Sequence, residues 1–193
     1  MKRQWSQKFD YLEKYLQQIQ ENPMNPNLTE NVYSLNREFK APASLVFDTW
    51  TQKEHLLGWY KPPGFTLEHK DFDVKVGGKS LHALTAPNGW KMWELHRYQE
   101  VDKPKKLSYI HSFSNEQGEI TANPQSPNWP KQTLITISFS EEAGVTKVSF
   151  ELTPHEASEE EVQAFNESLN ANTKGGWTMA FDNLAQYINS LQN

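Results

Sequence analysis

The chain has 193 residues, of which 36% are hydrophobic and 12% aromatic, and its formal net charge is −5 at pH 7. This length predicts one domain with at most a short appendage, and it is sufficient for a hydrophobic core. The absence of cysteine excludes disulfide bonds, thiolate metal sites and a cysteine nucleophile. Because the net charge is negative, we expect no nucleic-acid partner.

Residues 1–20 are predicted to form an amphipathic helix. Its apolar side chains recur at alternating spacings of four and three residues, which places them on one helix face: Trp5, Phe9, Leu12, Leu16 and Ile19. We interpret residues 1–31 as this helix followed by a linker that contains proline and asparagine. The short apolar repeat favours a helix docked on its own domain, and a homodimer formed through this helix is the alternative.

The chain shows no pattern of a secretory signal or of a membrane span. The first twenty residues begin with basic side chains but lack a continuous apolar run, and no segment approaches about 18 consecutive apolar residues. We therefore expect a cytoplasmic protein without a membrane partner.

From residue 32 onward the pattern changes to that of a mixed domain. Residues 32–39 alternate between apolar and polar side chains and predict a strand. Pro42 suits the first turn of a helix, and two short helices with a break near Thr51 are expected before residue 60. About six further strands, separated by glycine-containing and proline-containing turns, are predicted between Phe65 and Pro154. Their tight turns favour an antiparallel arrangement.

Two features interrupt this regular pattern. The connection between Ser114 and Lys131 is long for a compact domain, which is typical of a functional or mobile loop. After Ser158 and three consecutive glutamates, apolar residues recur at helical spacing to the end of the chain, and Gly175-Gly176 interrupts this pattern. The order of elements predicts an α+β fold, with a curved antiparallel sheet of about seven strands wrapped around a long C-terminal helix.

Residues 37–66, REFKAPASLVFDTWTQKEHLLGWYKPPGFT, resemble the opening of a known family. Further blocks match in the same order: Asp73–Gly78, Pro87-Asn88-Gly89, Tyr98–Val101 with Leu107, and Gly176-Trp177 followed by Leu184-Ala185 and Tyr187. The family is that of homologues of the activator of heat-shock protein 90 ATPase, within the START-like (SRPBCC) superfamily. The resemblance covers about Val32 to Leu191, so we assign residues 32–193 to a START-like domain.

This resemblance implies a helix-grip fold with an elongated cavity between the concave face of the sheet and the C-terminal helix. The two short helices and the connecting loops are expected to cap the cavity. The chain departs from the family pattern in two places. The first 30 residues lie outside the match, and Leu95-His96 stands where many members place a glycine before the tyrosine of that strand.

Nine residues are candidates for lining a ligand site: Trp59, Trp93, Tyr109, His111, Phe113, Ile135, Ile137, Trp177 and Phe181. Most are aromatic or aliphatic, and they fall on elements that the implied fold wraps around its cavity. An apolar pocket with few polar groups is typical of a site for a hydrophobic small molecule. Alternatively, each side chain simply fills the core.

Four histidines lie on four successive predicted strands: His69, His82, His96 and His111. Hairpins centred near Asn88 and Lys103 would place His82 opposite Glu94 and His96 opposite His111. Two or three histidines beside a carboxylate can bind Zn²⁺ or act as acid and base. The spacing matches no known metal motif, so we expect these side chains to line the pocket or a solvated sheet face, with no catalytic residue, metal or cofactor.

Three functions remain open. The first is binding of a hydrophobic or aromatic small molecule by a carrier, sensor or sequestering protein, without catalysis. The second is a co-chaperone-like interaction module that uses the N-terminal helix or the outer face of the sheet. The third is a cyclase-type or hydrolytic enzyme that uses pocket histidine and tyrosine residues. The first follows most directly from the implied cavity and from the absence of a catalytic motif.

Overall fold

The structure is a computed structural model that describes residues 28–29, 31–171 and 173–192. The predicted N-terminal helix lies outside the described residues, so its role in docking or in a homodimer stays a prediction. Leu28 and Thr29, which fall in the predicted linker, form a short strand that pairs with Val32 and Tyr33.

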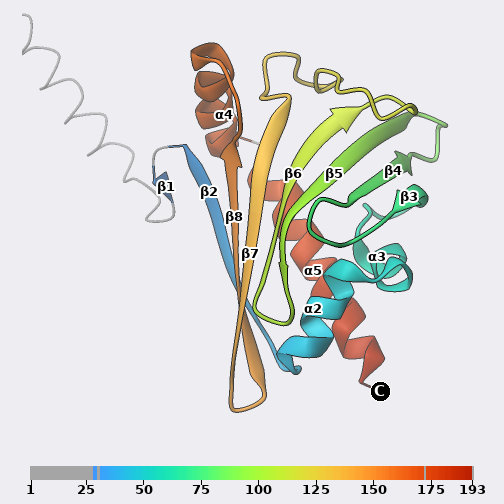
Figure 1. The fold of residues 1–193 in the computed structure, drawn as a ribbon, viewed down its shortest axis with the longest axis vertical. Coiled ribbons are helices and arrows are strands. Elements are labelled where there is room, and N and C mark those ends of the chain that lie inside the picture. Colours follow the sequence, from blue (N-terminus) through green and yellow to red (C-terminus); the bar gives the residue numbers. More distant parts are fainter. Residues whose placement is uncertain (1–27, 30, 172, 193) are drawn as a thin grey trace, which may run out of the picture.

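The fold is built on one antiparallel sheet (Figure 1). Its strands are β1 (Leu28–Thr29), β2 (Val32–Phe39), β3 (Thr66–Phe72), β4 (Lys79–Thr85), β5 (Lys91–Asp102), β6 (Lys106–Ser114), β7 (Gln132–Glu142) and β8 (Val145–Pro154). They are ordered β1-β2-β8-β7-β6-β5-β4-β3 across the sheet. Strands β3 to β8 therefore form a continuous meander, and β2 returns to pair with β8.

Within the described residues, four helices accompany the sheet: α2 (Ala43–Thr51), α3 (Lys53–Trp59), α4 (Glu159–Ala171) and α5 (Thr173–Leu191). The sheet curves around α5, while α2 and α3 lie beside the C-terminal half of that helix (Figure 1). The predicted α+β helix-grip fold, with about seven main strands and two short helices after the first of them, is confirmed. The predicted C-terminal helical segment is described as α4 and α5.

The predicted turns occur where glycine permits them. Gly77 and Gly89 have φ angles of 77° and 83°, in the left-handed region that other residues rarely adopt. Gly78 is required for a different reason, because a Cβ atom there would lie 2.2 Å from the backbone oxygen of Asp73. The strand pairing is irregular between His69 and Asp71.

An aromatic core fills the space between the sheet, α2 and the middle of α5. Phe150 on β8 is fully buried, and its ring centroid lies 4.3 Å from that of Trp177, 5.7 Å from that of Phe181 and 6.4 Å from that of Trp50. Trp50 in turn lies 4.6 Å from Trp59 at the end of α3. Much of the aromatic content of the sequence thus joins the short helices, the sheet and α5 into one core.

Candidate functional site

A cavity of about 550 Å³ lies between the concave face of the sheet and α5. Apolar side chains line much of it, from strands, from α5 and from the loop 115–131: Met92, Phe113, Ile135, Leu152, Trp177 and Trp129. Volumes of about 300–1,000 Å³ are typical of small-molecule sites. The cavity is therefore large enough to hold a ligand.

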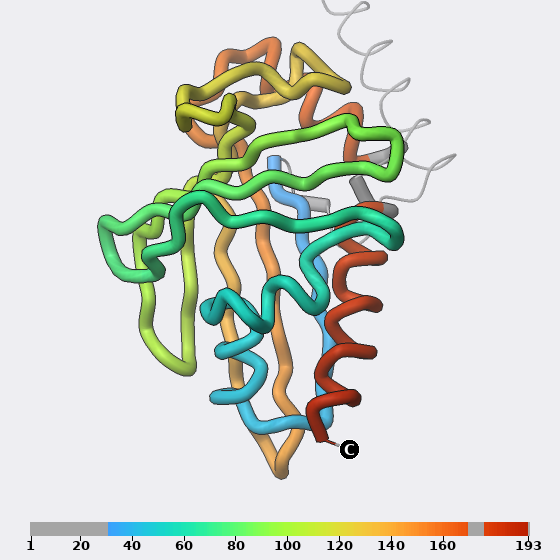
Figure 2. The backbone as a smooth tube through the Cα atoms, turned by 90° about the vertical axis from the view of Figure 1, so that its right-hand side faces the viewer, coloured from blue at the N-terminus to red at the C-terminus, as the bar shows by residue number. Residues whose placement is uncertain are grey.

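The loop 115–131 forms part of the cavity wall. The ring of Trp129 packs against Phe165 of α4 at a centroid distance of 5.1 Å, and this contact holds the loop beside α4 (Figure 2). The side chain of Asn123 accepts hydrogen bonds from the backbone N–H groups of Gln125 and Ser126, which fixes a turn within the loop. This long connection is thus an ordered part of the site.

Polar side chains of β4, β5 and β6 gather beside Tyr60, the residue that follows α3. The hydroxyl of Tyr60 donates a hydrogen bond of 3.2 Å to Glu94 Oε2, and His82 Nε2 lies 3.0 Å from the same oxygen. His111 Nε2 lies 3.7 Å from Glu94 Oε1, a distance compatible with an ion pair but too long for a hydrogen bond. Only 6% of Glu94 is exposed, so protein groups rather than bulk solvent surround most of this carboxylate.

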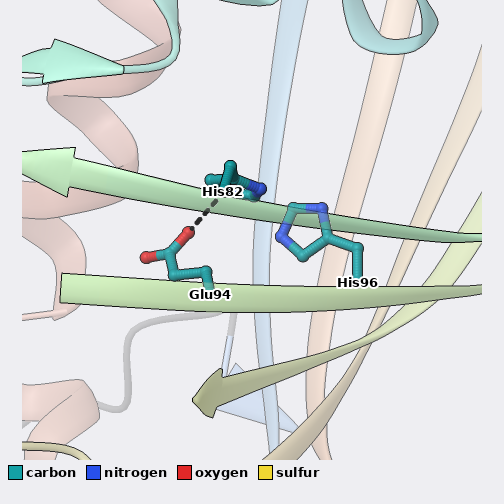
Figure 3. Close-up of side chains that lie close together, drawn as sticks. All are labelled: His82, Glu94 and His96. Atoms are coloured by element: carbon teal, nitrogen blue, oxygen red, sulfur yellow. Dashed lines mark hydrogen bonds and ion pairs between the residues drawn. The ribbon is translucent and has the colours of Figure 1, made fainter. Parts of the chain in front are cut away.

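His96 completes this cluster (Figure 3). Its ring centroid lies 4.7 Å from that of His82 and 4.3 Å from that of Tyr109, on which it stacks. The Nε2 atom of His96 and the Nδ1 atom of His82 are buried without a hydrogen-bond partner among the described protein atoms. Both side chains border a small void of about 10 Å³, the size of one water molecule.

The buried environment fixes the protonation of two members of the cluster. Burial raises the pKa of Glu94, but the interactions with His111 and His82 outweigh burial and hold that pKa well below its usual range. Burial, together with the neighbouring rings of His82 and His111, holds the pKa of His96 well below the usual value. At neutral pH the cluster therefore contains a carboxylate and a neutral His96 imidazole.

The strand register explains why these residues meet. His82 is directly opposite Glu94, and His96 is directly opposite His111, as the turn positions predicted. Tyr98 is opposite Tyr109 in the same hairpin. Because side chains alternate between the two faces of a strand, Glu94, His96 and Tyr98 all lie on the concave face.

The nine residues predicted to line a ligand site divide into three groups. His111, Phe113, Ile135 and Trp177 border the 550 Å³ cavity. Tyr109 borders the small void beside His96 instead. The remaining four residues lie elsewhere: Trp59, Ile137, Phe181 and Trp93.

Trp59, Ile137 and Phe181 are buried in the core beneath the cavity. Trp59 donates a hydrogen bond of 2.9 Å from Nε1 to the backbone oxygen of Thr49, which directs the indole toward α2. Phe181 is one helical turn beyond Trp177 and packs against Phe39 and Phe150. These side chains support the floor of the cavity but do not border it.

The position of Trp93 differs most from the prediction that this residue lines the ligand site. It lies on the opposite face of the sheet, because it precedes Glu94 on β5 and neighbouring side chains alternate. The ammonium groups of Lys70 and Lys91 lie 5.9 Å and 5.5 Å from the centroid of its indole ring. Trp93 thus takes part in cation–π contacts on the convex face.

Tyr60 and Trp129 are cavity residues that the sequence interpretation did not assign to the site. Tyr60 follows α3 immediately, and Trp129 belongs to the long connection. The available signal was a large aromatic side chain in each of two segments expected to cap the cavity. Only the folded chain shows that Tyr60 reaches the carboxylate of Glu94.

A curved antiparallel sheet that encloses a C-terminal helix, with a cavity between them, defines a START-like domain of the helix-grip class. The model of one family, described as Activator of Hsp90 ATPase homolog 1-like protein, matches residues 40–189. The chain therefore belongs to this family. A search of curated proteins found no significant relative.

Several solved structures share the fold. A solution structure of a Staphylococcus epidermidis protein is 26% identical, with a TM-score of 0.68 over 87% of this chain and 95% of that one. A solution structure from Arthrobacter aurescens is 20% identical, with a TM-score of 0.69 over 83% and 87% of the two chains. A crystal structure of a Mycobacterium smegmatis protein is 22% identical, with a TM-score of 0.64 over 81% and 90%. Within the described residues, no helix is both long and apolar enough to span a membrane.

Proposed function

We propose that the protein binds an apolar or aromatic small molecule in the 550 Å³ cavity, and acts as a carrier, sensor or sequestering protein. The observation that carries this proposal is the cavity itself, which lies between Trp177 on α5 and the apolar side chains of the concave sheet face. A site of this size, with apolar side chains from the sheet and α5 and with polar groups gathered near Glu94 and along the loop 115–131, suits a ligand with an apolar body and some polar groups.

The position of the polar groups supports binding in one orientation. Glu94, His111 and Tyr60 border the cavity, whereas Met92, Phe113 and the other apolar side chains form much of the remaining wall. A ligand with an apolar body and one polar group could place that group near Glu94, where a carboxylate, an imidazole and a phenol are close together and offer hydrogen-bond partners. The polar end thus sets orientation and selectivity, and the apolar walls supply most of the binding free energy.

The proposal is tested with a neutral fluorescent probe, N-phenylnaphthylamine, and with native mass spectrometry of the purified protein. The probe should bind in the cavity and gain fluorescence, and native spectra should show any co-purified ligand. Ala180→Trp would place a large side chain in the cavity and should weaken probe binding at least about tenfold. Probe recovered after incubation should be chemically unchanged.

The matched control is Gln186→Trp, which adds the same side chain to an exposed position of the same helix and should leave probe binding unchanged. Both variants are first compared with the wild type by circular dichroism. Failure of the wild type to bind the probe, or equal effects of the two substitutions, would contradict binding in this cavity. Conversion of the probe would contradict a purely binding role.

A further inference from the structure

Hydrogen bonds do not satisfy all the buried polar atoms in the cluster of His82, Glu94 and His96. Each of the three residues is at most 6% exposed. Buried polar atoms in folded proteins nearly always have partners, and leaving one without a partner costs about 1–3 kcal/mol. Nevertheless, Nε2 of His96 has no partner among the described protein atoms, although Nε2 of the neighbouring His82 contacts Glu94.

The carboxylate of Glu94 poses a related problem. Its described polar partners are Tyr60, His82 and His111, and none of them is a lysine or arginine. His111 and His82 stabilise this carboxylate, but neither histidine carries a permanent positive charge as lysine or arginine does. A bound cation would compensate this charge, and a neutral histidine would supply a lone pair to the same ion.

The spacing of the donor atoms fits one ion. His82, Glu94 and His96 each offer one donor atom, and these three atoms all lie within 4.8 Å of one another. Around a tetrahedral Zn²⁺ with bonds of about 2.0–2.1 Å, neighbouring donors lie about 3.3 Å apart. The 3.0 Å contact between His82 and Glu94 already meets this spacing. His96 would need to approach by at most about 1.5 Å, next to the small void.

We propose that His82, Glu94 and His96 form a site for one divalent transition-metal ion of the Zn²⁺ class, with a fourth coordination position open toward the cavity. Two imidazoles and one carboxylate favour Zn²⁺ or a similar metal over Mg²⁺ and Ca²⁺, which prefer oxygen ligands. This departs from our expectation from the sequence, where the ligand spacing matched no known metal motif.

The surroundings of the site support the open fourth position. Glu94 borders the 550 Å³ cavity, whereas His82 and His96 border the small void behind it. His111 lies beside Glu94 on the cavity side, and Tyr60 covers the carboxylate from the end of α3. A metal ion held by the three ligands would be reached from the cavity past Glu94 and Tyr60, the two cluster residues beside the ion that border it. Three protein ligands with one open position are typical of zinc sites that bind a water or a polar ligand group.

The experiment uses full-length protein freed of metal with a chelator and titrated with Zn²⁺ by calorimetry, then with Co²⁺ by visible absorption. We expect one ion per chain, binding at low micromolar concentration or tighter, and the intense visible bands of tetrahedral Co²⁺. Glu94→Gln and His96→Gln should each weaken Zn²⁺ binding at least about 100-fold, since loss of even a supporting outer contact costs about 10–100-fold.

His155→Asn is the matched control, because His155 is a histidine far from the cluster, after β8, and its loss should not change the affinity. Nuclear magnetic resonance of the wild type gives a second measurement: Zn²⁺ should shift the ring nitrogens of His82 and His96 but not those of His155. Absence of stoichiometric binding by the wild type would overturn the proposal. Equal binding by Glu94→Gln and the wild type, or shifts confined to His155, would also overturn it.

Circular dichroism checks that each variant is folded, and the resonance measurement does not depend on any variant. The metal site is also independent of the proposed function. Zn²⁺ binding with no probe binding would support the metal site and contradict the ligand cavity. Probe binding with no Zn²⁺ binding would support the ligand cavity and contradict the metal site.

Discussion

Replacing Phe150 by alanine removes the ring on which the aromatic core converges. The ring is fully buried and lies against Trp177 and Phe181 of α5 and against Trp50 of α2. These neighbouring rings belong to two different helices, α5 and α2, and other contacts hold the helices in place. For example, Arg37 of β2 pairs with Asp182 of α5 at 2.6 Å. The cavity left by the substitution should thus collapse only partly.

Truncation of a buried phenylalanine to alanine typically costs about 3–5 kcal/mol, and more when the site cannot collapse. For Phe150→Ala we expect a loss of about 4 kcal/mol. This is a large part of the free energy of unfolding of a typical protein, which is about 5–15 kcal/mol. With a urea dependence of about 2.5 kcal/mol per molar for a domain of this size, the midpoint of unfolding should fall by about 1.5 M. Circular dichroism and tryptophan fluorescence would follow the transition.

Phe113→Ala is the comparison that isolates burial. Phe113 is also a strand phenylalanine on the concave face, but it is only partly buried and borders the cavity, so its truncation should cost about 1–2 kcal/mol. If Phe150→Ala destabilises the protein no more than Phe113→Ala, then Phe150 does not anchor the core, and the packing described above is wrong.

Two further predictions concern a turn and a buried phenol. Gly77→Ala should lower the free energy of unfolding by about 1 kcal/mol because of the positive φ at this position. Gly78→Ala should lower it by at least about 2 kcal/mol, because the added Cβ would collide with the backbone of Asp73. Thermal unfolding would distinguish the two variants, and equal losses would contradict this reasoning. Burial raises the pKa of Tyr98 from 10.0 to about 12 despite its hydrogen bond with Ser80. The contribution of Tyr98 to stability is therefore complete below pH 10 and is lost as the pH rises through 12. At about pH 11 the loss of stability should reach about 1.4 kcal/mol, measurable by urea unfolding. Tyr98→Phe should reduce that loss, and an unchanged loss would assign it to other groups.

The register of the central hairpins could be predicted because their turns are short and chemically distinctive. The turn at Asn88-Gly89 places His82 opposite Glu94, and this pairing is present. The same alternation puts Trp93 on the other face once Glu94 faces inward. The pairing of His82 with Glu94 therefore also places Trp93 on the outer face, since neighbouring residues of a strand cannot both line one cavity.

Other features of the site depend on tertiary contacts that leave no local pattern. The helical spacing correctly grouped Trp177 with Phe181, but only packing decides that Trp177 borders the cavity while Phe181 fills the core. Likewise, Trp129 is held by Phe165, which is far away in the sequence. Periodicity shows which residues share a face of a helix or strand. It does not show which part of that face borders the cavity and which part packs in the core.

The pairing irregularity between His69 and Asp71 has a consequence for association between chains. β3 ends the order of the sheet, so its outer backbone groups could template a strand from another molecule. Its exposed Glu68, Lys70 and Asp71 place charges along this edge, and the irregularity disturbs the flat row of hydrogen-bonding groups that a second strand would need. The exposed edge therefore carries its own protection against strand-to-strand aggregation.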